Sequence, residues 1–140
     1  MRFIACGLVK TTVELPLYAR LAQIDAGLAK VLEMHRPDVA AIEETFMNKN
    51  AASALKLGMA RGAAMVVPAR LGLAVHEYAA NLVKKSLTGT GHADKDQIGM
   101  MVRVLLPAVG KAAADEADAL AIAICHAHHG TSKMRAAARN

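Results

Sequence analysis

The sequence contains few aromatic residues and few cysteines. Phe, Tyr and Trp together make up 3% of its 140 residues, and Trp is absent. Such a composition, with alanine abundant, favours closely packed helices over a β-sandwich. The only cysteines are Cys6 and Cys125. Two isolated thiols exclude a disulfide framework and indicate a reducing compartment.

Long apolar runs are also missing. None approaches the roughly 18 residues that a membrane span needs. The apolar start at residues 3–9 is followed by Lys10-Thr11-Thr12 rather than by the small residues of a signal-peptide cleavage site. We therefore expect a soluble, cytoplasmic protein. A net charge of +5 fits an anionic partner but is just as common in ordinary enzymes.

Strand and helix patterns alternate along the chain and predict an α/β fold. Helical spacing from Leu17 to Leu32 should end at Pro37, and Asn50 is placed to cap a second helix. We expect one domain over residues 1–130 and a flexible basic tail over 131–140. The expected strands are 2–10, 38–43 and 73–78, and the expected helices are 16–35, 51–67, 79–86, 98–105 and 115–127, with a break at 68–72.

Asp115 and Asp118 lie three residues apart at the start of the last predicted helix and should face the same side. One interpretation is helix-start chemistry, because acids there stabilise the positive end of the helix dipole and Asp115 could act as a cap. The other is a pair of hard oxygen ligands for a divalent ion such as Mg²⁺. Spacing alone leaves both open.

Glu43 and Glu44 close the predicted strand at 38–43. A carboxylate at the carboxyl end of an inner strand lies where α/β folds bind ligands. Successive strand residues point to opposite faces, so only one glutamate could share a site with the aspartates. Two solvated charges at a strand exit are the alternative.

Cys125, His126, His128 and His129 gather near the end of the last predicted helix. They could bind a soft metal, but positions so close in sequence scatter around a helix. We interpret this group as structural or incidental.

Three long blocks resemble the RuvC family of Holliday-junction resolvases. They are VAAIEETFMNKNAASALKLGMARG at 39–62, HEYAANLVKKSLTGTGHADKDQIGMMV at 76–102 and ADEADALAIAICH at 114–126. Their order and spacing match the family, and the similarity extends from about residue 2 to the late 120s. The resemblance implies a ribonuclease-H-like mixed sheet flanked by helices, in a homodimer that nicks two opposed strands of a four-way DNA junction during recombination and repair.

The resemblance also assigns the site. Family members hold two Mg²⁺ ions, for which Mn²⁺ can substitute, with four carboxylates, and Glu43, Asp115 and Asp118 match three of them. Phe46 resembles the family's base-stacking aromatic, and Lys84 and Lys95 resemble lysines that face DNA phosphates. Lys49, Lys85 and Arg103 are weaker phosphate candidates, on charge alone. The helix at 51–67 resembles the one through which family members dimerise. A branch-migration helicase complex is the further partner that the resemblance implies.

The start of the chain departs from the family pattern. Family members open with a strand that carries an aspartate–proline–glycine motif, and this aspartate is the fourth metal ligand. The chain as written lacks a match to it and to the first two strands, so we expect residues 38–43 to expose an unpaired strand edge. A start codon assigned too late is our preferred explanation. The alternative function is a truncated, non-catalytic protein that binds junctions or dimerises.

Overall fold

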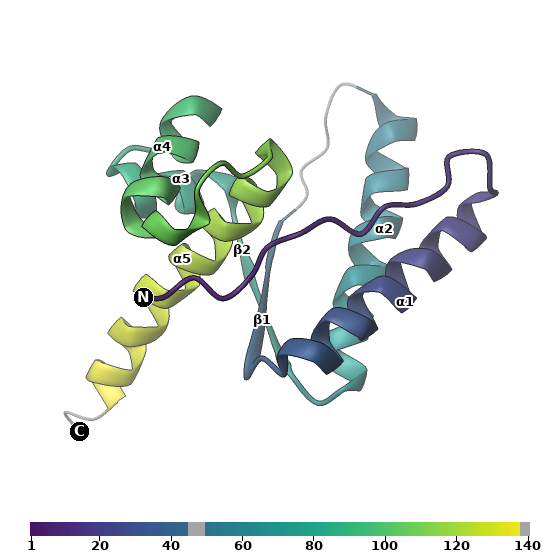
Figure 1. Ribbon diagram of the computed structural model, residues 1–140, viewed down its shortest axis with the longest axis horizontal. Coiled ribbons are helices and arrows are strands. Elements are labelled where there is room, and N and C mark those ends of the chain that lie inside the picture. The colour runs from purple at the N-terminus through teal and green to yellow at the C-terminus, as the bar shows by residue number, and fades with distance from the viewer. Residues whose placement is uncertain (45–49, 138–140) are drawn as a thin grey trace. The chain divides into compact units, whose positions relative to one another are not determined.

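The computed structural model describes residues 1–44 and 50–137, with side chains through residue 130. It divides into two compact units (Figure 1), Val9–Glu77 and a second that combines Met1–Leu8 with Tyr78–Asn140. We call them the helix–sheet unit and the helical unit and describe each by itself. In the described part of the chain, no helix is long and apolar enough to cross a membrane.

The helix–sheet unit contains α1 (Leu17–His35), β1 (Val39–Glu43), α2 (Ala51–Arg70) and β2 (Ala74–Tyr78). The last residue of β2, Tyr78, belongs to the helical unit. The backbone N–H of Ser53 donates to the side-chain oxygen of Asn50 at 3.1 Å, so Asn50 caps α2 as its sequence position predicts. α1 packs against α2 and ends at Arg36, which adopts the left-handed conformation with φ 44°.

The two strands form a parallel sheet, with α2 as the crossover between them. Among the described residues β1 pairs with β2 alone, so its other edge has no neighbouring strand, as expected for residues 38–43. Because the two strands are parallel, their carboxyl ends lie at the same end of the sheet, and Glu43 is the last residue of β1 there.

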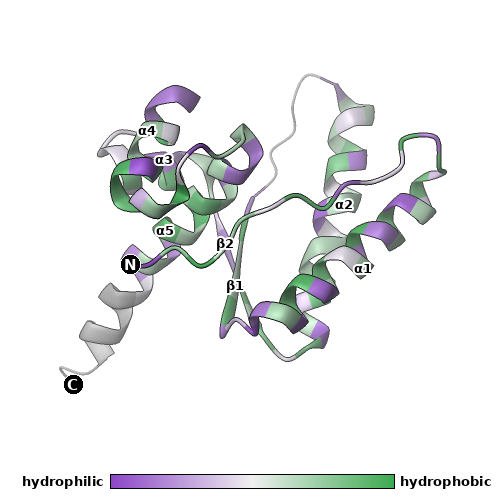
Figure 2. Cartoon of the chain, viewed as in Figure 1, coloured by the Kyte–Doolittle hydropathy of each residue, from purple (hydrophilic) through white to green (hydrophobic). Residues whose placement is uncertain are grey.

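The helical unit holds α3 (Ala80–Thr88), α4 (Lys95–Leu105), the short 3₁₀ helix η1 (Pro107–Val109) and α5 (Ala114–Ala137). α3, α4 and α5 pack against one another, and α4 presents both apolar and polar residues (Figure 2). The apolar face of α4 contributes Ile98 and Val102 to the core of this unit. The buried residues of this core are Val83, Leu87, Ala93, Ile98, Val102, Leu106, Leu120, Ala121, Ile124 and Cys125.

The strand predicted at residues 2–10 is wrong, because this segment forms no regular element. An extended segment counts as a strand only where its N–H and C=O groups pair with a neighbour. The end of the segment instead lies along α1, where Val9 contacts the helix at Gly27. Just beyond it, the backbone N–H of Thr12 donates to Gln23 Oε1 at 2.8 Å.

Two predicted helix ends are also wrong. α2 passes through Pro68 and ends at Arg70. A proline so near the end of a helix removes only one hydrogen bond. The carbonyl oxygen of Pro68 still accepts hydrogen bonds from the backbone N–H groups of Leu71 and Leu73. α5 continues to Ala137 instead of ending near residue 127.

Candidate active site

Asp115 and Asp118 lie in the first two turns of α5, which begins at Ala114. The Glu116 carboxylate accepts from the backbone N–H of Ala113 at 2.8 Å. Glu116 therefore supplies the reciprocal side-chain bond of a helix start. Asp115 is the second residue of the helix and does not precede it, so the interpretation of Asp115 as a cap is wrong.

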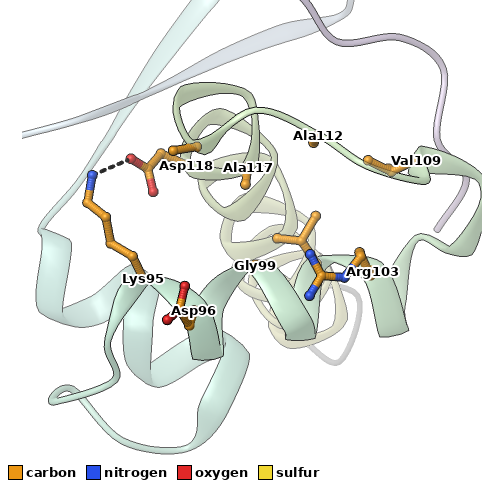
Figure 3. Close-up of a pocket in the computed structure, with 10 residues that line it drawn as sticks. Lys95, Asp96, Gly99, Arg103, Val109, Ala112, Ala117 and Asp118 are labelled. Atoms are coloured by element: carbon orange, nitrogen blue, oxygen red, sulfur yellow. Dashed lines mark hydrogen bonds and ion pairs between the residues drawn. The ribbon is translucent and has the colours of Figure 1, made fainter.

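Lys95 reaches the Asp118 carboxylate across the packed pair α4 and α5. Its Nζ lies 3.3 Å from Asp118 Oδ2, and the two side chains are 78% and 42% exposed (Figure 3). A capping box places Lys95 as the first residue of α4, because Asp94 and Gln97 exchange backbone and side-chain hydrogen bonds of 2.9 and 2.8 Å.

Lys95 and Asp118 also line a cavity of about 360 Å³. Arg103 lies one turn beyond Gly99 on the same face of α4, and a Cβ added at Gly99 would lie 3.9 Å from Arg103 Nη1. The guanidinium therefore folds back over this glycine (Figure 3), so the cavity carries two cationic groups, of Lys95 and Arg103, and two carboxylates, of Asp96 and Asp118. Its lining residues are Lys95, Asp96, Gly99, Val102, Arg103, Val109, Ala112, Ala114, Ala117 and Asp118.

Lys84, the other predicted phosphate-binding lysine, is half-buried on α3 and does not line this cavity. Its backbone carbonyl accepts a 2.9 Å bond from Thr88 Oγ1, which tightens the last turn before Gly89, where φ is 79°. The neighbouring Lys85, a weaker candidate on charge alone, is exposed.

Glu43 is exposed at the end of β1, and its backbone carbonyl accepts from Arg61 Nε at 2.8 Å. It belongs to the helix–sheet unit, whereas Asp115 and Asp118 belong to the helical unit. The meeting of the three carboxylates therefore stays a prediction. Phe46 lies outside the described residues, as does Lys49.

The three histidines in the middle of α5 all have hydrogen-bonding partners within the protein. The Nδ1 atoms of His126 and His128 lie 2.7 Å from Tyr78 Oη and 3.0 Å from Ser86 Oγ. His129 Nδ1 lies 2.9 Å from the carbonyl oxygen of Cys125, four residues earlier. Within the helical unit these bonds tie α5 to Tyr78 and to α3, and they agree with the structural interpretation.

The donor set of Asp115 and Asp118 fits a hard divalent cation such as Mg²⁺. Both are carboxylates on one side of a helix start, and the Asp118 oxygen already faces a cationic ammonium. Within residues 1–44 and 50–137, no three His, Cys, Asp or Glu side chains gather into a group that could hold a metal ion. Any complete ligand set therefore requires more than the two aspartates.

The family model described as "Crossover junction endodeoxyribonuclease RuvC" matches residues 1–126. The chain belongs to the RuvC family. A protein of that name from Allorhizobium ampelinum is 56% identical over 138 residues, which are 98% of this chain and 82% of that protein. Another from Rhodopseudomonas palustris strain BisA53 is 57% identical over 133 residues, 95% of this chain and 76% of the relative.

Solved RuvC structures have the same fold. The Thermus thermophilus RuvC structure superposes with a TM-score of 0.83 at 35% identity, covering 94% of this chain and 80% of that one. T. thermophilus RuvC in complex with a Holliday junction substrate gives 0.82 at 37% identity, covering 92% and 79%. The predicted ribonuclease-H-like α/β fold is thereby confirmed.

Sequence reasoning ranked Arg103 only as a weak phosphate candidate and missed Arg61. A usable signal existed for Arg103, because Lys95, Gly99 and Arg103 recur every four residues and must share one face of α4. No local pattern signals Arg61, whose partners lie 18 and 16 residues away.

Proposed function

We propose that this chain is a structure-specific DNA endonuclease that resolves four-way junctions by paired, Mg²⁺-dependent nicks in recombination and DNA repair. The observation that carries the proposal is the match of residues 1–126 to the RuvC family model, a range that includes Glu43, Asp115 and Asp118. The relative solved with a Holliday junction substrate supports junction DNA as the partner.

Asp115, Asp118 and Glu43 are the residues that we propose to hold the metal. Bound there, two Mg²⁺ ions, or Mn²⁺ in their place, would lower the pKa of an attacking water and stabilise charge on the leaving oxygen. The three carboxylates would hold the ions in place. Asp115 and Asp118 do so from the rigid start of α5, which Glu116 fixes by its bond to the backbone of Ala113.

Lys95 and Arg103 are proposed to bind backbone phosphates beside the aspartates. Lys95 is 78% exposed, so its ammonium can leave Asp118 and turn to a phosphate at little cost. Arg103 supplies a planar guanidinium that can bond two phosphate oxygens at once. Lys84 on α3 and Phe46 remain proposed DNA contacts, Lys84 to phosphate and Phe46 as a base-stacking aromatic.

We also propose a cytoplasmic homodimer that pairs through α2 and works beside a branch-migration helicase complex. α2 combines small residues with apolar side chains that are exposed in the single chain. Leu55, Leu57 and Met59 are 61%, 53% and 40% exposed. Covering such side chains is what a symmetric interface on this helix achieves.

The second candidate is a non-catalytic protein that binds junctions. The observation that favours it is the position of the Lys95 ammonium, 3.3 Å from Asp118 Oδ2, where it would compete with a cation for this carboxylate. In that case Lys95 and Arg103, which line the cavity between α4 and α5, would bind DNA phosphates without cutting.

A labelled four-way junction, incubated with the chain and Mg²⁺ and separated on a denaturing gel, distinguishes the two. Paired nicks in the junction, absent from a linear duplex of the same sequence, are the expected result. Glu43→Gln and Asp118→Asn should abolish nicking and leave junction binding intact, while Glu14→Gln makes the same chemical change at an exposed position outside the site. Binding without nicking by the unaltered chain would select the non-catalytic candidate.

A further inference from the structure

The side chain of Arg61, on α2, joins the carboxyl ends of both strands of the sheet. Its Nε donates to the backbone carbonyl oxygen of Glu43 at 2.8 Å. Its Nη2 forms an ion pair with Glu77 Oε2. Glu43 is the last residue of β1 and Glu77 the fourth of five in β2, so one guanidinium bridges two strands at the edge where parallel sheets place ligands.

Arg61 is more buried than the other ion-paired arginine of its helix. Its side chain is 20% exposed, against 46% for Arg70, the other arginine of α2 that forms an ion pair. The two arginines also differ in what they hold. Arg70 binds both carboxylate oxygens of Asp25 and joins two helices, whereas Arg61 binds a strand-end peptide group.

We propose that Arg61 is a positioning residue for Glu43, an inference that rests on the proposed role of Glu43 as a metal ligand. The carbonyl carbon of Glu43 is bonded directly to its Cα. A charge-assisted bond to the carbonyl oxygen therefore restricts ψ of Glu43, and with it the direction in which the side chain leaves the end of β1.

Glu77 orients the guanidinium of Arg61. An arginine held by one bond can rotate about its side-chain torsions, but a second anchor at Nη2 fixes the plane of the group and keeps Nε aimed at the Glu43 carbonyl. Partners that orient a metal ligand commonly change metal affinity by about tenfold or more when they are lost.

The test is a titration of the full chain with Mn²⁺, with free Mn²⁺ followed by its electron paramagnetic resonance signal. We expect Arg61→Ala to weaken Mn²⁺ binding by about tenfold. It should also raise the Mg²⁺ concentration needed for half-maximal junction nicking, without changing junction binding in the absence of metal. Arg70→Ala is the matched control, since it removes an ion-paired arginine from the same helix and should leave Mn²⁺ affinity unchanged.

Two further variants keep the result decisive. Arg61→Lys retains the charge but has a single donor group, which cannot reach both partners, so it should also weaken Mn²⁺ binding. It serves as the test if Arg61→Ala loses the helical circular dichroism of the parent. Wild-type Mn²⁺ affinity in the folded Arg61 variants, with affinity lost in Glu43→Gln, would overturn the positioning role alone. Unchanged affinity in Glu43→Gln would instead overturn the metal assignment of the proposed function, and the positioning role with it.

Discussion

Lys95 Nζ lies 3.3 Å from Asp118 Oδ2, so the lysine ammonium forms an ion pair with a carboxylate that we propose to hold a metal. The two residues are 23 positions apart and meet because α4 packs on α5. With side chains 78% and 42% exposed, such a pair contributes at most about 1 kcal/mol to folding. Binding rather than stability should therefore reveal what Lys95 does.

Lys95→Gln should leave the midpoint of thermal unfolding nearly unchanged and weaken junction binding. Loss of one phosphate contact should lower the slope of log affinity against log salt by about one. Fluorescence anisotropy with a labelled junction at several salt concentrations measures both quantities. Lys30→Gln removes the same charge from an exposed position on α1 and serves as the control; an equal loss of slope there would point to net charge alone.

Arg103→Gln should lower the salt slope by a further unit if its guanidinium binds a separate phosphate. The double variant with Lys95→Gln should then lose about two units, because the two groups line one cavity but neutralise different phosphates. The same anisotropy titration tests this. A double variant no weaker than Lys95→Gln would remove Arg103 from the DNA contacts.

Gly27→Ala should destabilise the protein even though alanine is the better helix former by about 1 kcal/mol. A Cβ at Gly27 would overlap Val9 Cγ1 and would also lie only 3.3 Å from Val9 Cβ, so Val9 would have to move away from α1. Thermal unfolding by circular dichroism should show a lower midpoint. Gly130→Ala on α5 is the control, because its nearest contact is 3.8 Å away, and it should be neutral or stabilising.

The ion pair of Asp25 with Arg70 should stabilise the protein at neutral pH and not in strong acid. The hydrogen bond from Arg70 holds the pKa of the Asp25 carboxyl below its ordinary value. A lowered folded-state pKa contributes stability above the ordinary aspartate pKa of about 3.9, and the contribution is lost as pH falls through the folded value. Denaturant unfolding should therefore separate Arg70→Gln from the parent at pH 7, with the difference shrinking as the pH falls below the ordinary aspartate pKa and through the lowered folded-state pKa. A difference independent of pH would contradict this.

The two thiols should differ sharply in reactivity. Cys6 is exposed, whereas Cys125 lies fully inside the core of the helical unit. The pKa of both thiols is raised, that of Cys6 by desolvation and the nearby Glu116 carboxylate and that of Cys125 by burial, so access rather than pKa separates them. Reaction with a disulfide reagent at pH 8 should modify Cys6 in the folded protein and Cys125 only on unfolding. Cys6→Ser should abolish the native-state reaction, and rapid modification of both thiols in the native parent would show that this core opens easily.

Local patterns predicted much of the fold. Apolar spacing and Pro37 bounded α1, Asn50 marked the start of α2, and short apolar runs gave β1 and β2. These succeed because capping, proline geometry and side-chain periodicity act over a few residues. Local patterns failed at residues 2–10, because a strand needs a pairing partner elsewhere in the chain. They also failed at Pro68, because the hydrogen bonds at the end of α2 decide where this helix stops.

The sequence by itself determined the family and the types of residue at the candidate site. Glu43, Asp115, Asp118 and Lys95 all fall in motif blocks whose order and spacing can be found along the chain. Only the tertiary structure decided that Lys95 meets Asp118 and that Arg61 ties the end of β1 to Glu77. Contacts between residues 16 to 23 positions apart depend on how helices and strands pack, and no local periodicity encodes that.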